Sequence, residues 1–139
     1  MISRLVSCKI AGMKTILIVD DSRIMRNIVK NYFAKLEILC DYLEAEDGEE
    51  ALEILKQHKV DLVLLDWNMP KLSGLDFLKT VRAIDKYADM PIIMVTSEAA
   101  RYNVIEALKT GATDYIIKPI NEKMFVEKVT RVLKWSNGM

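Results

Sequence analysis

The chain has 139 residues, of which 51% are hydrophobic, and its 20 basic side chains balance 20 acidic ones. This length predicts one domain, and this hydrophobic fraction is sufficient for a core, which excludes an intrinsically disordered chain. A net charge of zero provides no general attraction to nucleic acid or to a membrane surface. The two cysteines, Cys8 and Cys40, indicate neither a disulfide framework nor a metal knuckle, which is typical of the reducing cytoplasm.

Residues 1–13 show no clear periodicity, and we treat them as an amino-terminal extension without an assigned function. Arg4 and Lys9 interrupt the apolar positions, so this segment does not have the continuous apolar stretch of a signal peptide. No apolar run approaches the roughly 18 residues that a membrane-spanning helix needs. We therefore expect one cytoplasmic domain over residues 14–139, without membrane insertion.

The first half of that domain alternates between strand and helix. Thr15–Val19 predicts a buried strand, and a helix capped by Ser22 follows it. We interpret the basic residues on one face of this helix, including Arg26, as a solvated surface. Tyr42–Ala45 predicts a short second strand, and the third is Leu62–Leu65, an unbroken apolar run typical of a strand buried on both faces.

The second half repeats this pattern. A third helix is expected to turn four apolar residues inward: Leu75, Leu78, Val81 and Ile84. Met90–Thr96 predicts the fourth strand, and a weaker helix after it ends at Gly111. Tyr115–Ile117 predicts the fifth strand, and Asn121 caps the last helix. Five strand–helix units with short connections require parallel strands, so we predict an α/β fold with a doubly wound five-stranded sheet and helices on both faces.

Polar side chains gather where the predicted strands end. They are Asp20, Asp21, Asp66, Thr96 and Lys118. In open parallel sheets, ligands bind at this edge. Three close carboxylates repel one another unless a cation neutralises them, and Mg2+ prefers oxygen ligands. The residues therefore predict a magnesium site at which Asp66 attacks a phosphoryl group, while Lys118 neutralises its oxygens and Thr96 donates a hydrogen bond.

Four segments resemble the receiver domain of two-component response regulators: IVDDS at 18–22, LLDWNMP at 64–70, MVTSEA at 94–99 and YIIKP at 115–119. The resemblance covers roughly Lys14 to Trp135, and DWNMP followed by TSEA favours the chemotaxis branch, the CheY-type single-domain regulators. It implies the flavodoxin-like (βα)5 receiver fold for residues 14–139. It also implies a signalling switch that catalyses only its own phosphorylation and dephosphorylation.

The resemblance assigns the site residue by residue. Asp66 would be the phosphoacceptor. Asp21, Asp66 and the backbone carbonyl of Asn68 would bind Mg2+ directly, and Asp20 largely through a water molecule. Lys118 would pair with the phosphoryl oxygens, and the peptide bond that follows it is expected to be cis.

The resemblance also implies how the signal is passed on and ended. On phosphorylation Thr96 would move toward the phosphoryl group, and the ring of Tyr115 would move inward. Asn68 and Glu98 would overhang the line of attack of water, a pairing that goes with rapid self-dephosphorylation in the family. The output surface would be the fourth helix, fifth strand and fifth helix, with these contributors: Arg101, Asn103, Tyr115 and Lys128.

The implied partners are proteins. A histidine kinase of the CheA type would supply the phosphoryl group, the flagellar motor switch protein would be the target, and a phosphatase is possible. The chain would act as a monomer and bind no nucleic acid. Trp67, beside the phosphoacceptor, would report on the site by fluorescence. Ile120 departs from the family, which often has an aromatic residue after the cis proline.

Three alternatives compete with this interpretation. A Mg2+-dependent aspartyl-phosphate phosphatase of the haloacid-dehalogenase type needs a second aspartate two positions after its nucleophile, where this chain has Asn68. A flavin-binding module needs a phosphate loop, where Asp20 and Asp21 would repel the phosphate. A phosphorelay intermediate or an adaptor receiver has the same site, and the residues leave that alternative open.

Overall fold

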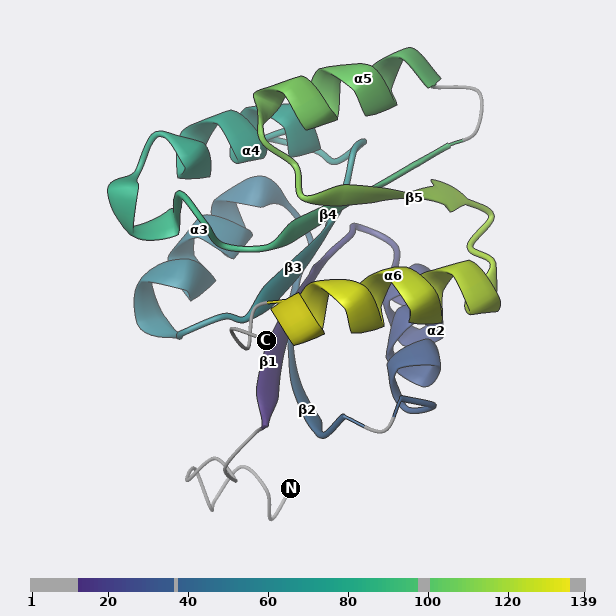
Figure 1. Ribbon diagram of the computed structural model, residues 1–139. Coiled ribbons are helices and arrows are strands. Elements are labelled where there is room, and N and C mark those ends of the chain that lie inside the picture. Colours follow the sequence, from purple (N-terminus) through teal and green to yellow (C-terminus); the bar gives the residue numbers. More distant parts are fainter. Residues whose placement is uncertain (1–12, 37, 98–100, 136–139) are drawn as a thin grey trace.

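The computed structural model describes residues 13–36, 38–97 and 101–135 (Figure 1). The predicted amino-terminal extension, residues 1–13, therefore lies outside the described residues except for Met13. The strands are β1 (Lys14–Val19), β2 (Cys40–Ala45), β3 (Leu62–Asp66), β4 (Ile92–Ser97) and β5 (Asp114–Lys118). The helices are α2 (Arg23–Phe33), α3 (Gly48–Gln57), α4 (Gly74–Arg82), the 3-10 helix η1 (Asp85–Tyr87), α5 (Arg101–Thr110) and α6 (Glu122–Trp135).

The five strands form one parallel sheet in the order β2-β1-β3-β4-β5. This arrangement confirms the predicted doubly wound α/β fold. From β1 the chain first runs outward to β2 and then returns to the other side as β3, so the winding direction reverses between β1 and β3. A crevice opens at such a reversal, beyond the carboxyl ends of the strands. Asp20 follows β1 and Asp66 ends β3, so both lie beside this crevice.

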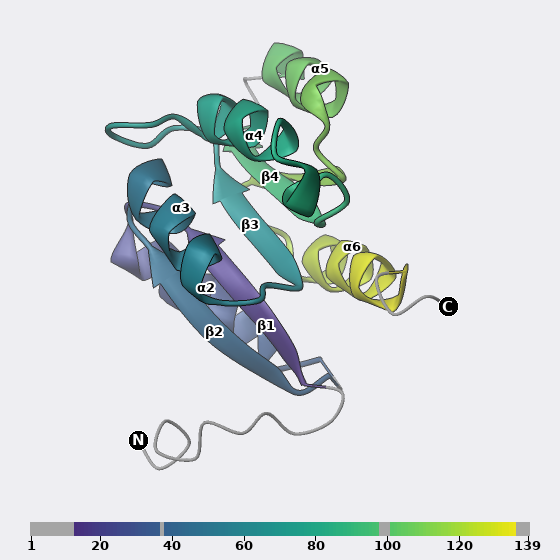
Figure 2. The same cartoon turned by 90° about the vertical axis from the view of Figure 1, so that its left-hand side faces the viewer.

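Helices α2 and α6 cover one face of the sheet (Figures 1 and 2). Val29 and Phe33 of α2 and Phe125 and Val129 of α6 pack with the apolar side chains of the strands. The rings of Phe33 and Phe125 meet edge to face, with centroids 5.1 Å apart. This contact joins the first and last helices of the domain in a single layer.

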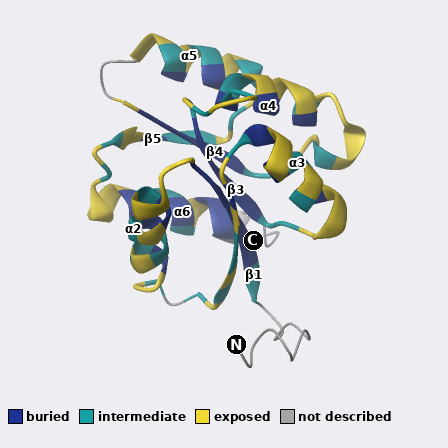
Figure 3. Cartoon of the chain, turned by 180° about the vertical axis from the view of Figure 1, so that it is seen from behind, coloured by how far each residue is buried: buried dark blue, intermediate teal, exposed yellow. Residues whose placement is uncertain are grey.

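Helices α3, α4 and α5 cover the other face, and the central strands β1, β3 and β4 are mostly dark blue between helices whose outer surfaces are exposed (Figure 3). The predicted inward face of α4 is partly wrong. Leu78 and Val81 are buried as expected, but Ile84 is 41% exposed because α4 ends at Arg82. Phe77, which the prediction omitted, is fully buried instead.

Side-chain caps begin the helices where the sequence suggested them. Ser22 Oγ accepts a hydrogen bond from the Met25 amide, and Asn121 Oδ1 accepts one from the Met124 amide. Gly111 directly follows α5 with a φ of +117°, a conformation that glycine adopts without the steric cost of a Cβ atom. Both predicted caps and the predicted helix end are therefore confirmed.

The basic face of α2 differs from the prediction at Arg26. This residue is buried, with 8% of its surface exposed, whereas the prediction placed its side chain in a solvated surface. Its partners are a carboxylate on β2 and a backbone carbonyl beside the crevice. A buried charge requires such partners, and these lie on other elements that the periodicity of α2 does not reveal.

Candidate functional site

Three carboxylates meet at the carboxyl edge of the sheet. Asp20, Asp21 and Asp66 each place one oxygen within 4.8 Å of the other two. Asp20 and Asp66 are buried, with 5% and 6% exposure, while Asp21 is open to solvent. The amide of Ser22 donates to Asp20 Oδ1 at 2.8 Å, so the turn that begins α2 also orients this carboxylate. The structure thus brings together the three aspartates that the sequence predicted as a cluster.

Lys118 brings a positive charge to this cluster from β5. Its Nζ lies 3.0 Å from Asp66 Oδ1 and 3.6 Å from Asp20 Oδ2. Strand β4 separates β5 from β3, so the long lysine side chain reaches past the end of β4 to make these contacts. The Lys118–Pro119 peptide bond is cis, as predicted.

The electrostatics of the site favour an added cation. Burial raises the pKa of the Asp66 carboxyl, and the negative charge of Asp20 raises it further, although Lys118 opposes both effects. Burial disfavours the charged form of Lys118, yet the hydrogen bond and the charges of Asp66 and Asp20 together raise its pKa. One ammonium group therefore does not fully compensate three clustered carboxylates. An all-oxygen donor set of this kind fits a hard divalent cation such as Mg2+.

The segment after β3 holds the phosphoacceptor candidate in place. The backbone amide of Asn68 donates to the Asp66 carboxylate, and the Asn68 residue is exposed. The Trp67 amide donates to the Val95 carbonyl at 3.0 Å, which continues the pairing of β3 with β4. The two residues that follow Asp66 thus restrain it, and Trp67 is half-buried against the core beside it.

Gly74 is a residue of the site that the sequence analysis missed. It begins α4, and its amide donates to the Trp67 carbonyl at 3.0 Å. A Cβ atom at this position would lie 2.3 Å from the backbone oxygen of Asp66. Only glycine allows this approach of helix to strand. The sequence did carry a signal, because a glycine directly after the helix cap Ser73 is less common than one at a helix end.

The remainder of this loop is fixed against α3. A Cβ atom on Gly48 would lie 2.8 Å from Leu72 Cβ, so the loop packs directly on the start of that helix. Lys71 has a φ of 65°, a conformation that favours glycine, and its Nζ lies 3.7 Å from Asp47 Oδ2. The loop that carries Asn68 is therefore positioned by a helix on the same side of the sheet.

Thr96 and Tyr115, the predicted switch pair, share one face of the sheet. Tyr115 lies opposite Met94 in the β4–β5 register, and Thr96 is two residues beyond Met94. Side chains alternate along a strand, so Thr96 points to the same face as Met94 and Tyr115. Thr96 is buried and Tyr115 is half-buried. Glu98, the predicted partner of Asn68 in dephosphorylation, lies outside the described residues.

The predicted output face combines one anchored lysine with an apolar surface. Lys128 Nζ lies 3.8 Å above the Tyr115 ring, donates to the Tyr115 carbonyl and forms an ion pair with Asp114 at 3.2 Å. Arg101 is exposed and Asn103 is half-buried. The sequence analysis did not identify the exposed apolar residues of α5 and β5, which are Tyr102, Ile105, Leu108 and Ile117.

No helix in the described ranges is long and apolar enough to cross a lipid bilayer. A hollow with a volume of about 1300 Å3 lies elsewhere in the described part of the chain. Its lining includes Val60, Met90 and Thr113, which precede β3, β4 and β5, so it opens at the amino ends of the strands. The acidic cluster at the opposite edge remains the candidate site because its side chains, and not its volume, supply the chemistry.

Comparison with known proteins identifies close similarity over most of the chain. The family model described as "Response regulator receiver domain" matches residues 16–130. A chemotaxis protein CheY homolog of Campylobacter jejuni is 48% identical over 124 residues, which cover 88% of this chain and 95% of the relative. The chemotaxis protein CheY of Pseudomonas aeruginosa is 40% identical over 123 residues, covering 88% and 98%. The solved structure of Vibrio cholerae CheY4 matches with a TM-score of 0.76 at 33% identity, covering 87% and 99%.

Proposed function

The chain belongs to the response regulator receiver domain family, and from that premise we propose that it is a phosphoacceptor switch in which Asp66 is phosphorylated. The observation that carries the proposal is the buried Asp66 carboxylate, 3.0 Å from Lys118 Nζ and clustered with two further aspartates. CheY-like receiver domains are signalling proteins and not classical enzymes. The chemistry proposed here is therefore limited to the chain's own modification.

In the phosphorylation step, one Asp66 carboxylate oxygen attacks the phosphorus of a phosphohistidine. The new oxygen–phosphorus bond forms as the nitrogen–phosphorus bond breaks, and the imidazole leaves with the bonding electron pair. Lys118 Nζ, now 3.0 Å from Asp66 Oδ1, would hold a phosphoryl oxygen. Asp21, Asp66 and the Asn68 carbonyl would hold Mg2+ directly, and Asp20 largely through a water molecule. The bound ion would supply positive charge to the carboxylates and the phosphoryl oxygens.

In the return step, water attacks the phosphorus as the bond from phosphorus to the Asp66 oxygen breaks, which releases inorganic phosphate and restores the Asp66 carboxylate. Asn68 lies at the exposed mouth of the site and would orient or obstruct that water. Glu98 is proposed to act with it. The signal would then decay without a separate enzyme, although a phosphatase could accelerate the decay.

The signal would leave through the α5–β5–α6 face. Thr96 and Tyr115 face the same side of the sheet, which supports a coupled movement of the two side chains. The exposed apolar residues of α5 and β5 provide a surface for a protein partner. Because the relatives are named chemotaxis proteins, we place the chain in chemotaxis, as a cytoplasmic monomer with a CheA-like kinase upstream and the flagellar motor switch protein downstream.

Radiolabelled acetyl phosphate, a small phosphoryl donor, tests the proposal without knowledge of the kinase. Wild-type protein should incorporate one phosphoryl group in the presence of Mg2+ and none in the presence of a chelator. Asp66→Asn should incorporate none, whereas Asp41→Asn, which changes an exposed aspartate on β2, should behave as wild type. Equal labelling of the Asp66→Asn variant would disprove the proposed phosphoacceptor.

A further inference from the structure

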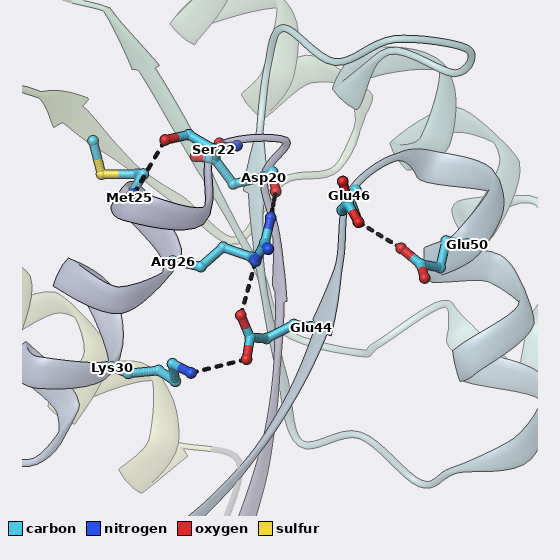
Figure 4. A network of polar contacts seen from close by, with 8 residues as sticks. All are labelled: Asp20, Ser22, Met25, Arg26, Lys30, Glu44, Glu46 and Glu50. Atoms are coloured by element: carbon cyan, nitrogen blue, oxygen red, sulfur yellow. Dashed lines mark hydrogen bonds and ion pairs between the residues drawn. The ribbon is translucent and has the colours of Figure 1, made fainter.

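A buried guanidinium group holds the peptide that joins two of the three site aspartates. Arg26 Nη1 donates to the backbone oxygen of Asp20 at 2.6 Å, and Arg26 Nε donates to Glu44 Oε1 at 2.8 Å (Figure 4). The carbonyl of Asp20 and the amide of Asp21 belong to one planar peptide unit. Arg26 therefore fixes the plane from which both carboxylates project.

The two neighbouring peptides and the Asp20 side chain are held by other hydrogen bonds. The Asp20 amide donates to the Ala45 carbonyl of β2 at 3.0 Å, and the Ser22 amide donates to Asp20 Oδ1 at 2.8 Å. These bonds fix the amide and the side chain of Asp20. The Asp20 carbonyl, which faces α2, depends on Arg26 for its side-chain contact. Loss of that contact would remove the side-chain restraint on the orientation of the peptide unit between the two aspartates.

Glu44 holds the Arg26 guanidinium group in place. It lies on β2 opposite Ile18 of β1, and Lys30 Nζ contacts its other oxygen at 2.8 Å (Figure 4). Hydrogen bonding to Lys30 is the largest influence that lowers the pKa of the Glu44 carboxyl, and Arg26 lowers it further. Glu44 is therefore ionised at neutral pH and balances the charge of Arg26, which otherwise would repel a cation bound at the site.

We propose that Arg26 is a positioning residue for the divalent-cation site, acting through the Asp20–Asp21 peptide. This inference rests on the proposed function, because it assumes that these aspartates bind Mg2+. Helix α2 already has a cap at Ser22 and core contacts at Val29 and Phe33, so its attachment to the sheet does not require a buried arginine. Ordering the acidic pair explains why a charged side chain is buried at this position.

Positioning and simple charge effects predict opposite outcomes. Arg26→Lys keeps the positive charge but removes the planar fork that contacts Asp20 and Glu44 together. Arg26→Met removes both the charge and the fork. If only charge mattered, the lysine variant would bind Mg2+ like wild type and the methionine variant would bind it more tightly. If Arg26 positions the aspartates, both variants bind Mg2+ more weakly.

Calorimetric titration of the full chain with Mg2+ tests this inference. We expect both Arg26 variants to lose about tenfold in affinity, the usual scale for removing a residue that orients metal ligands. Lys35→Met is the control, because Lys35 also pairs with a carboxylate, that of Glu122 at 2.9 Å, which is not one of the site aspartates. Its Mg2+ affinity should equal that of wild type. Thermal unfolding in the presence of a chelator reports separately on whether each variant is folded.

The result that overturns the inference is an Arg26→Lys variant that is folded and binds Mg2+ as wild type does. Tighter binding by Arg26→Met would overturn it as well, in favour of a charge effect. Failure of the proposed function is distinguishable, because wild-type protein itself would then bind no Mg2+. The lysine variant keeps the test decisive if the methionine variant does not fold.

Discussion

At the scale of single residues, the site combines groups that destabilise the fold with groups that restrain them. Asp66 is buried beside Asp20, and both effects raise its pKa, while Lys118 offsets only part of the cost. Such an arrangement is unfavourable for a protein that needs only to fold, and it is typical of functional sites. The phosphoacceptor candidate should therefore reduce the stability of the metal-free protein.

Asp66→Asn should raise the free energy of unfolding at pH 7 without metal, by about 1 kcal/mol. The sign follows from linkage: a folded-state pKa above the ordinary 3.8 means that the native state binds the proton more readily than the unfolded state. The free energy of unfolding of the wild type therefore falls as the pH rises from 3.8 through the folded-state pKa of Asp66. The variant has no carboxyl at this position and does not share this loss. Urea unfolding of both proteins between pH 7 and pH 4 measures the difference.

The difference in free energy of unfolding between Asp66→Asn and wild type should shrink as the pH falls to 3.8, because Asp66 is then protonated in the unfolded state as well. Added Mg2+ should make the wild type the more stable of the two proteins at pH 7, since binding stabilises only a protein with its full ligand set. A variant that is less stable than wild type at pH 7 in chelator would contradict the account of Asp66 as a strained, incompletely compensated charge.

At the scale of elements, the site depends on how closely α4 approaches the end of β3. The periodicity of α4 indicates which of its faces is buried but not how near its first turn comes to Asp66. That approach is measured at Gly74, where an added Cβ atom would meet backbone and not a movable side chain. Helix periodicity likewise does not reveal the contacts of Arg26, because its partners lie on β2 and at the end of β1.

Gly74→Ala should destabilise the protein by roughly 1–3 kcal/mol, the usual cost of overpacking, because the added Cβ atom would lie 2.3 Å from the backbone oxygen of Asp66. The shift of β3 or α4 that relieves this contact should also slow phosphorylation by about tenfold or more. Chemical denaturation and the rate of labelling by acetyl phosphate measure the two effects.

Ser73→Ala is the matched control for this prediction. It removes the hydrogen bond from the Asp76 amide to Ser73 Oγ, 3.2 Å long, and should cost about 1 kcal/mol of stability as other cap removals do. It leaves Asp66 in place, so its rate of labelling should match that of wild type. Equal rates for both variants would show that the approach of α4 to β3 does not position the phosphoacceptor.

At the scale of the whole molecule, alternation of strand and helix was enough to predict a doubly wound parallel sheet with helices on both faces. Four of the five strands read as short apolar runs that lead into a polar residue, and parallel winding brings those ends to one edge. Asp20, Asp21, Asp66 and Lys118 could therefore be assembled from their positions alone. Gly74, Arg26 and the exposed apolar residues of α5 could not, because their roles depend on contacts between elements that are distant in the sequence.

The central claim is that Asp66, Mg2+ and a phosphoryl group meet at one site, and Trp67 fluorescence tests it most directly. Trp67 is half-buried next to Asp66, so its emission should change on addition of Mg2+ and again on addition of beryllofluoride, a phosphoryl mimic. Trp67→Phe should abolish both changes, which excludes a signal from Trp135. In Asp66→Asn, beryllofluoride should have no effect. An equal beryllofluoride response in wild type and Asp66→Asn would contradict the account.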